Sequence, residues 1–195
     1  MKKRRTKRSI PDPLTSEEST SLLNVPNRRY PTGLRNYVMI RLMLSVGLRC
    51  AEVLSLRTQD VDLNSGKLKV NQGKGAKDRI LWLDVEMLSL MQQWRERRKI
   101  ESEWYFTTLK GERLDSRYMR AMMERYKIKA GIVRKCSPHT LRHTFATNLL
   151  KETGNIEIVR RALGHEDINT TGIYLHATDT ELESALKGFQ AKIPK

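Results

Sequence analysis

The sequence predicts an α+β domain that is mostly helical, with one small antiparallel sheet placed early in the chain. Three observations favour this fold class. Several long stretches carry apolar residues at helical spacing, a single pair of β-favouring runs surrounds a glycine-rich turn at 73–75, and from residue 137 onward the chain reads as helices only. With 195 residues and 38% hydrophobic composition, the chain is long enough for one domain with a hydrophobic core.

The helices expected ahead of the sheet are marked by their ends. Thr15 followed by Glu18 has the form of a capping box, which opens a first short helix. A strongly apolar helix is predicted over 34–46, because the periodic run stops near Gly47. A further helical piece is predicted over 51–56.

A β-hairpin is predicted by the segment KLKVNQGKGAKDRILWL, residues 67–83, whose two β-favouring runs flank the glycine-rich turn. Lys74 would lie at or near the tip of this hairpin, and residues 60–62 lead into a short strand before it. The sequence beyond the hairpin predicts an amphipathic helix over 84–100, a brief strand over 104–107 and a helix over 116–130.

The charge of the chain indicates its partner. Lys and Arg number 37 against 22 Asp and Glu, which gives a formal net charge of +15 spread through the chain. Such a field favours a polyanion. An anionic membrane surface would call for a basic amphipathic helix with an aromatic face or a lipidation signal, and neither is obvious. The longest apolar run, 37–48, is also well short of the roughly 20 residues of a membrane span. We therefore expect double-stranded DNA as the partner and no membrane.

The N-terminal segment differs from the rest. Residues 1–13 are basic, contain proline and are poor in apolar residues, so they are predicted to be an arm or linker, with 14–195 forming the domain. No apolar stretch follows the basic residues as it would in a signal peptide, so the protein is expected to stay inside the cell. Cys50 and Cys136 have neither metal-ligand spacing nor the density of a disulfide framework, and both are interpreted as small, buried residues.

Histidines cluster toward the C-terminus. The set is His139, His143, His165 and His176. In CSPHTLRHTFAT, Ser137 suits an N-cap and Pro138 the first helical position, so His139 and Arg142 would lie one turn apart at the start of a helix. A helix N-terminus that also carries an imidazole and a guanidinium is a credible phosphate seat. His139 and His143 lack the glutamate of His-Glu-x-x-His and a nearby cysteine, so no metal site is expected.

Five pieces of sequence together carry a resemblance. They are VGLRCAEVLSL around Arg49, GKGAKDR around Lys74, HTLRHTFAT around His139 and Arg142, LGH ending at His165, and Tyr174 nine residues later. In order and spacing this set resembles the catalytic residues of the tyrosine recombinases, also called the phage integrase family. The resemblance covers about residues 14–190 and implies the catalytic fold of these DNA breaking-rejoining enzymes.

The resemblance also implies a reaction. Tyr174 would attack a DNA phosphodiester, giving a 3′-phosphotyrosyl link and releasing a 5′ hydroxyl. Lys74 would deliver a proton to the leaving 5′ oxygen, His139 would accept the proton of the phenol, and His165 would hydrogen-bond the phosphate.

Two arginines would hold the charge that develops on the phosphoryl group. Arg49 and Arg142 can each grip phosphoryl oxygens with a planar pair of donors, so no metal ion is required. Glu52, which matches the acidic position of the family, would support the arginines. Because the phosphotyrosine conserves the energy of the phosphodiester, a second DNA hydroxyl can attack it and no nucleotide cofactor is needed.

The predicted function is therefore that of a site-specific recombinase of the integrase, invertase or resolvase type, from a bacterium, phage or mobile element, acting on the nucleoid in the cytoplasm. Two features depart from the family pattern. Only the basic arm precedes the catalytic domain in this sequence, where typical members carry a core-binding domain, so the chain is either part of a longer protein or similar to the small single-domain members that resemble the fimbrial phase-switch invertases. Val46 replaces the usual threonine. A type IB topoisomerase-like enzyme that nicks and reseals one strand, and a non-catalytic DNA-binding regulator with the same fold, remain as alternatives.

Other basic residues are predicted to touch DNA, and a last helix to mediate assembly. The predicted DNA contacts are Lys2, Lys3, Arg4, Arg5, Lys7, Arg8, Lys77 and Arg79. In ELESALKGFQ, an apolar stripe at helical spacing comprises Leu182, Ala185, Leu186 and Phe189. This stripe would either pack on its own domain or dock on a neighbouring subunit. The second role follows from the resemblance, which implies a protein that is a monomer in solution and a homotetramer on DNA.

Overall fold

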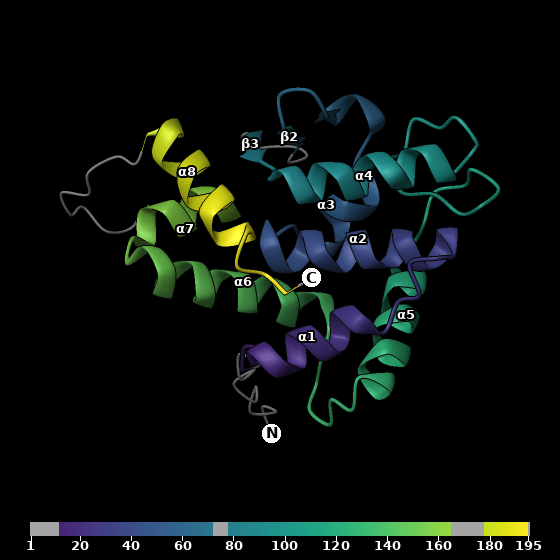
Figure 1. Cartoon of the computed structure of the whole chain (residues 1–195), viewed down its shortest axis with the longest axis horizontal. Helices are drawn as coiled ribbons and strands as arrows, with labels where there is room; N and C mark the ends of the chain where they lie inside the picture. The colour runs from purple at the N-terminus through teal and green to yellow at the C-terminus, as the bar shows by residue number, and fades with distance from the viewer. Residues whose placement is uncertain (1–11, 72–77, 165–177, 195) are drawn as a thin grey trace, which may run out of the picture.

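The structure, a computed structural model, describes residues 12–71, 78–164 and 178–194, with helix α2 running through the middle (Figure 1). Helix α2 (Pro31–Ser45) packs against α4 (Val85–Arg97) on one side and α6 (Pro138–Thr153) on the other. Every residue of α2 from Gly33 to Ser45 is buried, which explains why its sequence is apolar on nearly all sides. The helix predicted over 34–46 is confirmed and begins three residues earlier, at Pro31, a residue suited to a first helical turn.

Helix starts follow the capping residues in the sequence. Helix α1 (Ser16–Asn24) begins after Thr15, whose hydroxyl accepts from the backbone N–H of Glu18 while the Glu18 carboxylate accepts from the Thr15 backbone. This reciprocal arrangement is the predicted capping box. Asp84, Asp115 and Ser137 each accept a backbone N–H with the side chain and so cap α4, α5 (Ser116–Lys129) and α6, and Ser137 also forms a reciprocal capping box with Thr140.

The sheet has three antiparallel strands in the order β1-β2-β3. They are β1 (Val61–Asp62), β2 (Lys67–Val70) and β3 (Arg79–Trp82), and they follow α3 (Cys50–Ser55) and the 3₁₀ turn η1 (Thr58–Asp60). Leu68 pairs with Leu81, and both are fully buried, so one face of the hairpin joins the core. The predicted hairpin is confirmed, and its predicted tip at Lys74 lies outside the described residues.

The strand predicted over 104–107 is wrong. Trp104 and Thr107 form only isolated bridges, to Arg57 and Arg113. Side chains of α4 and of its C-terminal end bind the backbone here instead of a neighbouring strand: the Trp94 indole N–H donates to the Tyr105 carbonyl at 2.9 Å, and Arg98 to the Trp104 carbonyl at 2.7 Å. The carbonyls of Trp104 and Tyr105 are thus held by side chains of another element, and the described segment forms no continuous ladder.

The C-terminal helices close the core. They are α7 (Ile156–Leu163) and α8 (Asp179–Gln190), and within the described residues the segment after 137 is helical, as predicted. The apolar stripe of α8 faces the chain's own core: Leu186 is fully buried, and the Phe189 ring meets Phe145 edge-on with centroids 5.5 Å apart. Cys136 is buried as expected, and Cys50 is partly buried. Across the described ranges, no helix is both long and apolar enough to cross a membrane.

Candidate active site

A buried carboxylate, Glu52, lies where helix α3 begins. Arg49 immediately precedes this helix in extended backbone conformation, and Glu52 lies one turn further on with a side chain only 9% exposed. The backbone N–H of Arg49 donates to Glu52 Oε2 at 2.7 Å, and its Nη1 donates to Oε1 at 2.8 Å. The Arg49 side chain is 39% exposed, so this ion pair reaches from the interior to the surface.

Arg142 reaches the same place from helix α6. Its Nη1 lies 3.7 Å from Glu52 Oε2 and also donates to the carbonyl of Gly47. Gly47 ends the α2 turn with φ of +74°, and a Cβ there would lie 2.2 Å from the Phe145 ring, so only glycine fits. The short chain between α2 and α3 is thereby held against α6.

A third arginine binds Glu52 from the sheet. Arg79, the first residue of β3, donates from Nη1 and Nη2 to the two carboxylate oxygens of Glu52 at 3.0 and 2.9 Å. Its Nε donates to the Ala162 carbonyl at 2.9 Å, and the side chain is 8% exposed. We call Arg49, Glu52, Arg79 and Arg142 the Glu52 cluster.

The electrostatics of the cluster are shaped by burial and by three cations around one anion. For Glu52, burial alone would raise the pKa, but the hydrogen bonds and charge of Arg79, followed by the backbone and side-chain hydrogen bonds of Arg49, outweigh it and lower the pKa to about 2. Burial and the nearby charge of Arg49 lower the pKa of Arg142 to about 9, with Glu52 opposing the shift. Glu52 and Arg142 are therefore both charged at neutral pH, and guanidinium groups held beside a fixed carboxylate suit a seat for an anion.

The structure brings some of the predicted site residues together. Arg49, Glu52 and Arg142 meet in the Glu52 cluster, and His139 lies exposed in the first turn of α6, the helix that carries Arg142. Gly164 caps the end of α7 and directly precedes His165. Several predicted residues lie outside the described residues: Lys74, His165 and Tyr174, and, among the predicted DNA contacts, Lys2, Lys3, Arg4, Arg5, Lys7, Arg8 and Lys77.

Arg79 has partners that the sequence does not predict. Its contact with DNA stays a prediction, but Nε, Nη1 and Nη2 all donate to acceptors within the protein. One signal in the sequence pointed inward. Side chains two apart on a strand share a face, so Arg79 lies on the same face as Leu81, which is fully buried.

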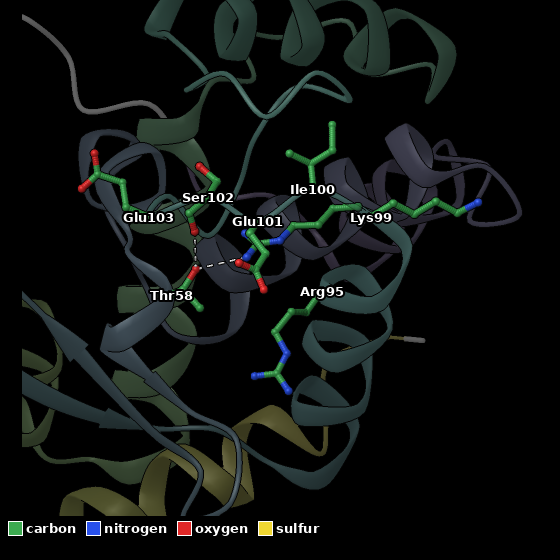
Figure 2. A pocket seen from close by; sticks show the side chains of 8 residues that line it. Thr58, Arg95, Lys99, Ile100, Glu101, Ser102 and Glu103 are labelled. Carbon is green, nitrogen blue, oxygen red and sulfur yellow. Dashed lines mark hydrogen bonds between the residues drawn. The ribbon is translucent and has the colours of Figure 1, made fainter.

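A separate cleft of about 690 Å³ lies beside the end of α4 (Figure 2). Its lining mixes both signs of charge, because Arg95 and Lys99 line it together with Glu101 and Glu103. The Thr58 hydroxyl donates to the Ser102 carbonyl at 3.0 Å, a bond that fixes the wall of the cleft. None of the predicted site residues lines it. Within the described ranges, no group of three or more His, Cys, Asp or Glu side chains is placed to hold a metal ion.

Comparison with known proteins identifies the class. The fold matches solved tyrosine recombinases: a XerA recombinase with a TM-score of 0.74 at 30% identity, covering 94% of this chain and 65% of that one, and XerH bound to its difH substrate before cleavage, with a TM-score of 0.71 at 30% identity, covering 83% and 49%. The predicted mostly helical tyrosine-recombinase fold is thus confirmed.

Sequence relatives agree with the structural ones. Residues 13–181 match the model of the phage integrase family. The chain is 35% identical to tyrosine recombinase XerD of Ralstonia nicotianae, over 90% of this chain and 59% of that protein, and 36% identical to XerA of Thermococcus kodakarensis, over 91% and 62%. The chain belongs to the phage integrase family. It spans about three fifths of the length of these relatives.

Proposed function

We propose that this chain is a site-specific DNA recombinase that cleaves and rejoins double-stranded DNA with Tyr174 as its nucleophile. One observation carries the proposal: Arg49, just before α3, and Arg142, from α6, meet at the buried carboxylate of Glu52 in a member of the phage integrase family. Two planar cations fixed by a shared carboxylate form a preorganised seat for a phosphodiester. The DNA-bound recombinase structures to which the chain is similar support the same partner.

The chemistry follows from the residue types. The Tyr174 oxygen attacks phosphorus as the bond to the 5′ oxygen breaks, leaving the 3′ phosphate on the tyrosine. His139 accepts the phenol proton, Lys74 supplies a proton to the leaving oxygen, and His165 hydrogen-bonds the phosphate. Attack by a 5′ hydroxyl of another strand reverses these steps and joins the DNA. No bond energy is lost to water, so the cycle needs no ATP.

Arg49 and Arg142 stabilise the transition state in place of a metal ion. Negative charge grows on the non-bridging oxygens during attack, and Arg49, 39% exposed beside the cluster, is accessible to them. Arg142 is more deeply buried, and its bonds to the carbonyls of Gly47 and Leu163 fix its guanidinium plane. Low exposure strengthens such interactions and avoids reorganisation during the reaction.

A trapping experiment tests the proposal. The protein is incubated in EDTA with a library of randomised duplexes that carry nicks. A nick lets the short fragment with the released 5′ hydroxyl diffuse away, so that the covalent protein–DNA adduct cannot be resealed. The adducts are then recovered and sequenced. We expect an adduct at a defined site with wild type and none with Tyr174→Phe, although the variant still binds DNA. An adduct from Tyr174→Phe, or one that requires magnesium, would contradict the proposal.

The same material separates the alternatives. A DNA-binding regulator would bind the selected duplex without forming an adduct. A topoisomerase-like enzyme would nick and reseal supercoiled DNA without joining two sites, whereas a recombinase would produce Holliday junctions from a pair of sites. We expect junctions.

Assembly is part of the proposal. We expect a monomer in solution, because the apolar stripe of α8 is already covered by its own domain, and a homotetramer on DNA. Light scattering of the free protein and of its complex with the selected site measures both states. A stable free tetramer, or a complex with a single subunit on paired sites, would contradict this assembly.

A further inference from the structure

Arg79 joins three segments of the protein at one buried point. It begins β3, its guanidinium binds both oxygens of Glu52 in α3, and its Nε binds the Ala162 carbonyl near the end of α7. Figure 1 shows β3 close to α8, and β3 also contacts α7. The three bonds measure 2.9 to 3.0 Å, so each lies within the normal range for N–H···O bonds.

The bidentate pair determines how Glu52 is oriented. A planar guanidinium that donates to both oxygens of a carboxylate fixes the carboxylate plane as well as its position. Arg49 then binds the same two oxygens through its backbone N–H and Nη1, at 2.7 and 2.8 Å. The direction in which Arg49 presents its remaining donors therefore depends on the plane that Arg79 sets.

Arg79 and Arg142 also share the end of α7. The last carbonyls of a helix have no intrahelical partner, and here the Ala162 and Leu163 carbonyls accept from Arg79 Nε and Arg142 Nη2 at 2.9 and 2.7 Å. Two neighbouring peptide groups thereby hold two arginines in a fixed relation. Loss of Arg79 would remove two hydrogen bonds from the Glu52 carboxylate and one from the Ala162 carbonyl at the end of α7.

We propose that Arg79 is a positioning residue for DNA cleavage, which orients the Arg49–Glu52–Arg142 phosphate seat from within the protein. This inference rests on the proposed function. It assigns Arg79 a role that requires the planar fork and its three acceptors, whereas a DNA-contacting Arg79 would act through its positive charge at the surface. The side chain is 8% exposed, which favours the internal role.

The test compares substrates that differ in charge. On the DNA site recovered by trapping, the scissile phosphate is replaced by a methylphosphonate, in which a methyl group takes the place of one non-bridging oxygen and removes the negative charge. A variant with a misaligned phosphate seat loses most of its rate on the charged phosphate and less on the neutral one. A variant that is merely less stable loses the same fraction on both. Rates of adduct formation are measured at saturating protein, separately from affinity.

Three variants are compared with wild type. Arg79→Met removes the charge and the fork, Arg79→Lys keeps the charge without the fork, and Lys69→Met removes an exposed charge from the neighbouring strand as a matched control. We expect Arg79→Met and Arg79→Lys to slow cleavage of the phosphate by about 10²-fold, the effect of small misplacements at reacting groups, and to slow the methylphosphonate clearly less. Lys69→Met should match wild type on both substrates.

The outcomes are distinct. Wild-type rates in Arg79→Met, full recovery in Arg79→Lys, or equal losses on both substrates would each overturn the positioning role. If Arg79→Met does not fold, the same comparison with Arg79→Lys decides. Absence of any adduct from wild type would instead contradict the proposed function and leave no reaction for Arg79 to serve.

Discussion

Two buried arginines of this protein are accommodated in opposite ways. Arg142 belongs to the Glu52 cluster, where three arginines gather around one carboxylate. Arg35, 2% exposed, donates instead to the Thr107 carbonyl at 2.6 Å and to the side chains of Asn36 and Tyr118. Its guanidinium lies 4.8 Å from the centre of the Tyr118 ring. No carboxylate in the described part of the chain forms an ion pair with Arg35.

The difference shows that burial of an arginine does not by itself mark a functional site. Arg35 is satisfied by neutral acceptors and by an aromatic face, which ties α2 to α5 and to the 107 backbone. Burial lowers the pKa of Arg35, and Tyr118 opposes the shift. In the Glu52 cluster, by contrast, cations from separate elements converge beside the partly exposed Arg49. Convergence of charge at an accessible point distinguishes the proposed phosphate seat from the structural cluster around Arg35.

The largest expected effect is kinetic. Arg142→Lys keeps the charge but loses the planar pair of donors, and each lost charge-assisted bond is worth about 1.5–3 kcal/mol, or roughly one to two decades of rate. We expect adduct formation on the nicked site to slow by that amount, and Arg49→Lys to behave alike. Arg35→Lys is the matched control and should react at the wild-type rate. Equal losses of cleavage rate in Arg142→Lys and Arg35→Lys would show that the surroundings of Arg142 are no more important for cleavage than those of Arg35.

The second effect concerns stability and its dependence on pH. Because the folded chain lowers the pKa of Glu52 from 4.5 to about 2, its carboxylate stabilises the fold above about pH 4.5, and this contribution is lost as the pH falls toward 2. A difference of that size corresponds to roughly 3 kcal/mol. Urea unfolding should show Glu52→Gln less stable than wild type by about this amount at pH 7, with the gap narrowing in acid. A stability difference between wild type and Glu52→Gln that does not change with pH would show that the charge of Glu52 does not stabilise the fold.

A smaller loss of stability is expected in the Arg35 cluster, meaning Arg35 with Asn36, Tyr118 and the Thr107 carbonyl. Arg35→Met leaves the carbonyl without its donor, and an unsatisfied buried acceptor costs about 1–3 kcal/mol. Because the native partners are neutral, this loss should hardly change between pH 4.5 and 2. Thermal unfolding at several pH values measures it, and a cleavage defect in the folded variant would contradict a purely structural role.

The smallest effect concerns basic residues that belong to neither cluster. Deleting residues 2–8 removes six positive charges. We expect weaker DNA binding and a shallower slope of log affinity against log salt, by about 0.9 for each phosphate that the arm neutralises in the full chain. Cleavage at saturating protein should be unchanged. A salt dependence identical to that of the full chain would show that the arm binds no phosphates.

Local rules in the sequence predicted the helices and the hairpin. Thr15 with Glu18, and Ser137 with Pro138, specify helix starts through bonds made within four residues, so they can be recognised without tertiary information. The segment 104–107 has the composition of a strand, but its carbonyls accept hydrogen bonds from Trp94 and Arg98, which belong to α4 and its C-terminal end. A competition of this kind depends on packing and cannot be found in the segment itself.

The candidate site shows the same limit. Arg49, Glu52 and Arg142 could be selected because they match the order and spacing of a known family, and the structure brings their side chains together. Arg79 was predicted to contact DNA as one of several basic residues. The alternation with Leu81 indicates an inward face, but its partners Glu52 and Ala162 lie 27 and 83 residues away, so only the folded chain shows which acceptors it binds.

The central claim is that the Glu52 cluster seats a phosphate for attack by Tyr174, and mass spectrometry of the trapped adduct tests it most directly. Cleavage after Lys and Arg releases residues 162–187 as one peptide, in which Tyr174 is the only tyrosine. After nuclease digestion, we predict that wild type carries a nucleotide 3′-phosphate on Tyr174, and that Arg142→Lys gives the same modified peptide at a much lower yield. Attachment at any other residue, or an undiminished yield from Arg142→Lys, would contradict the account.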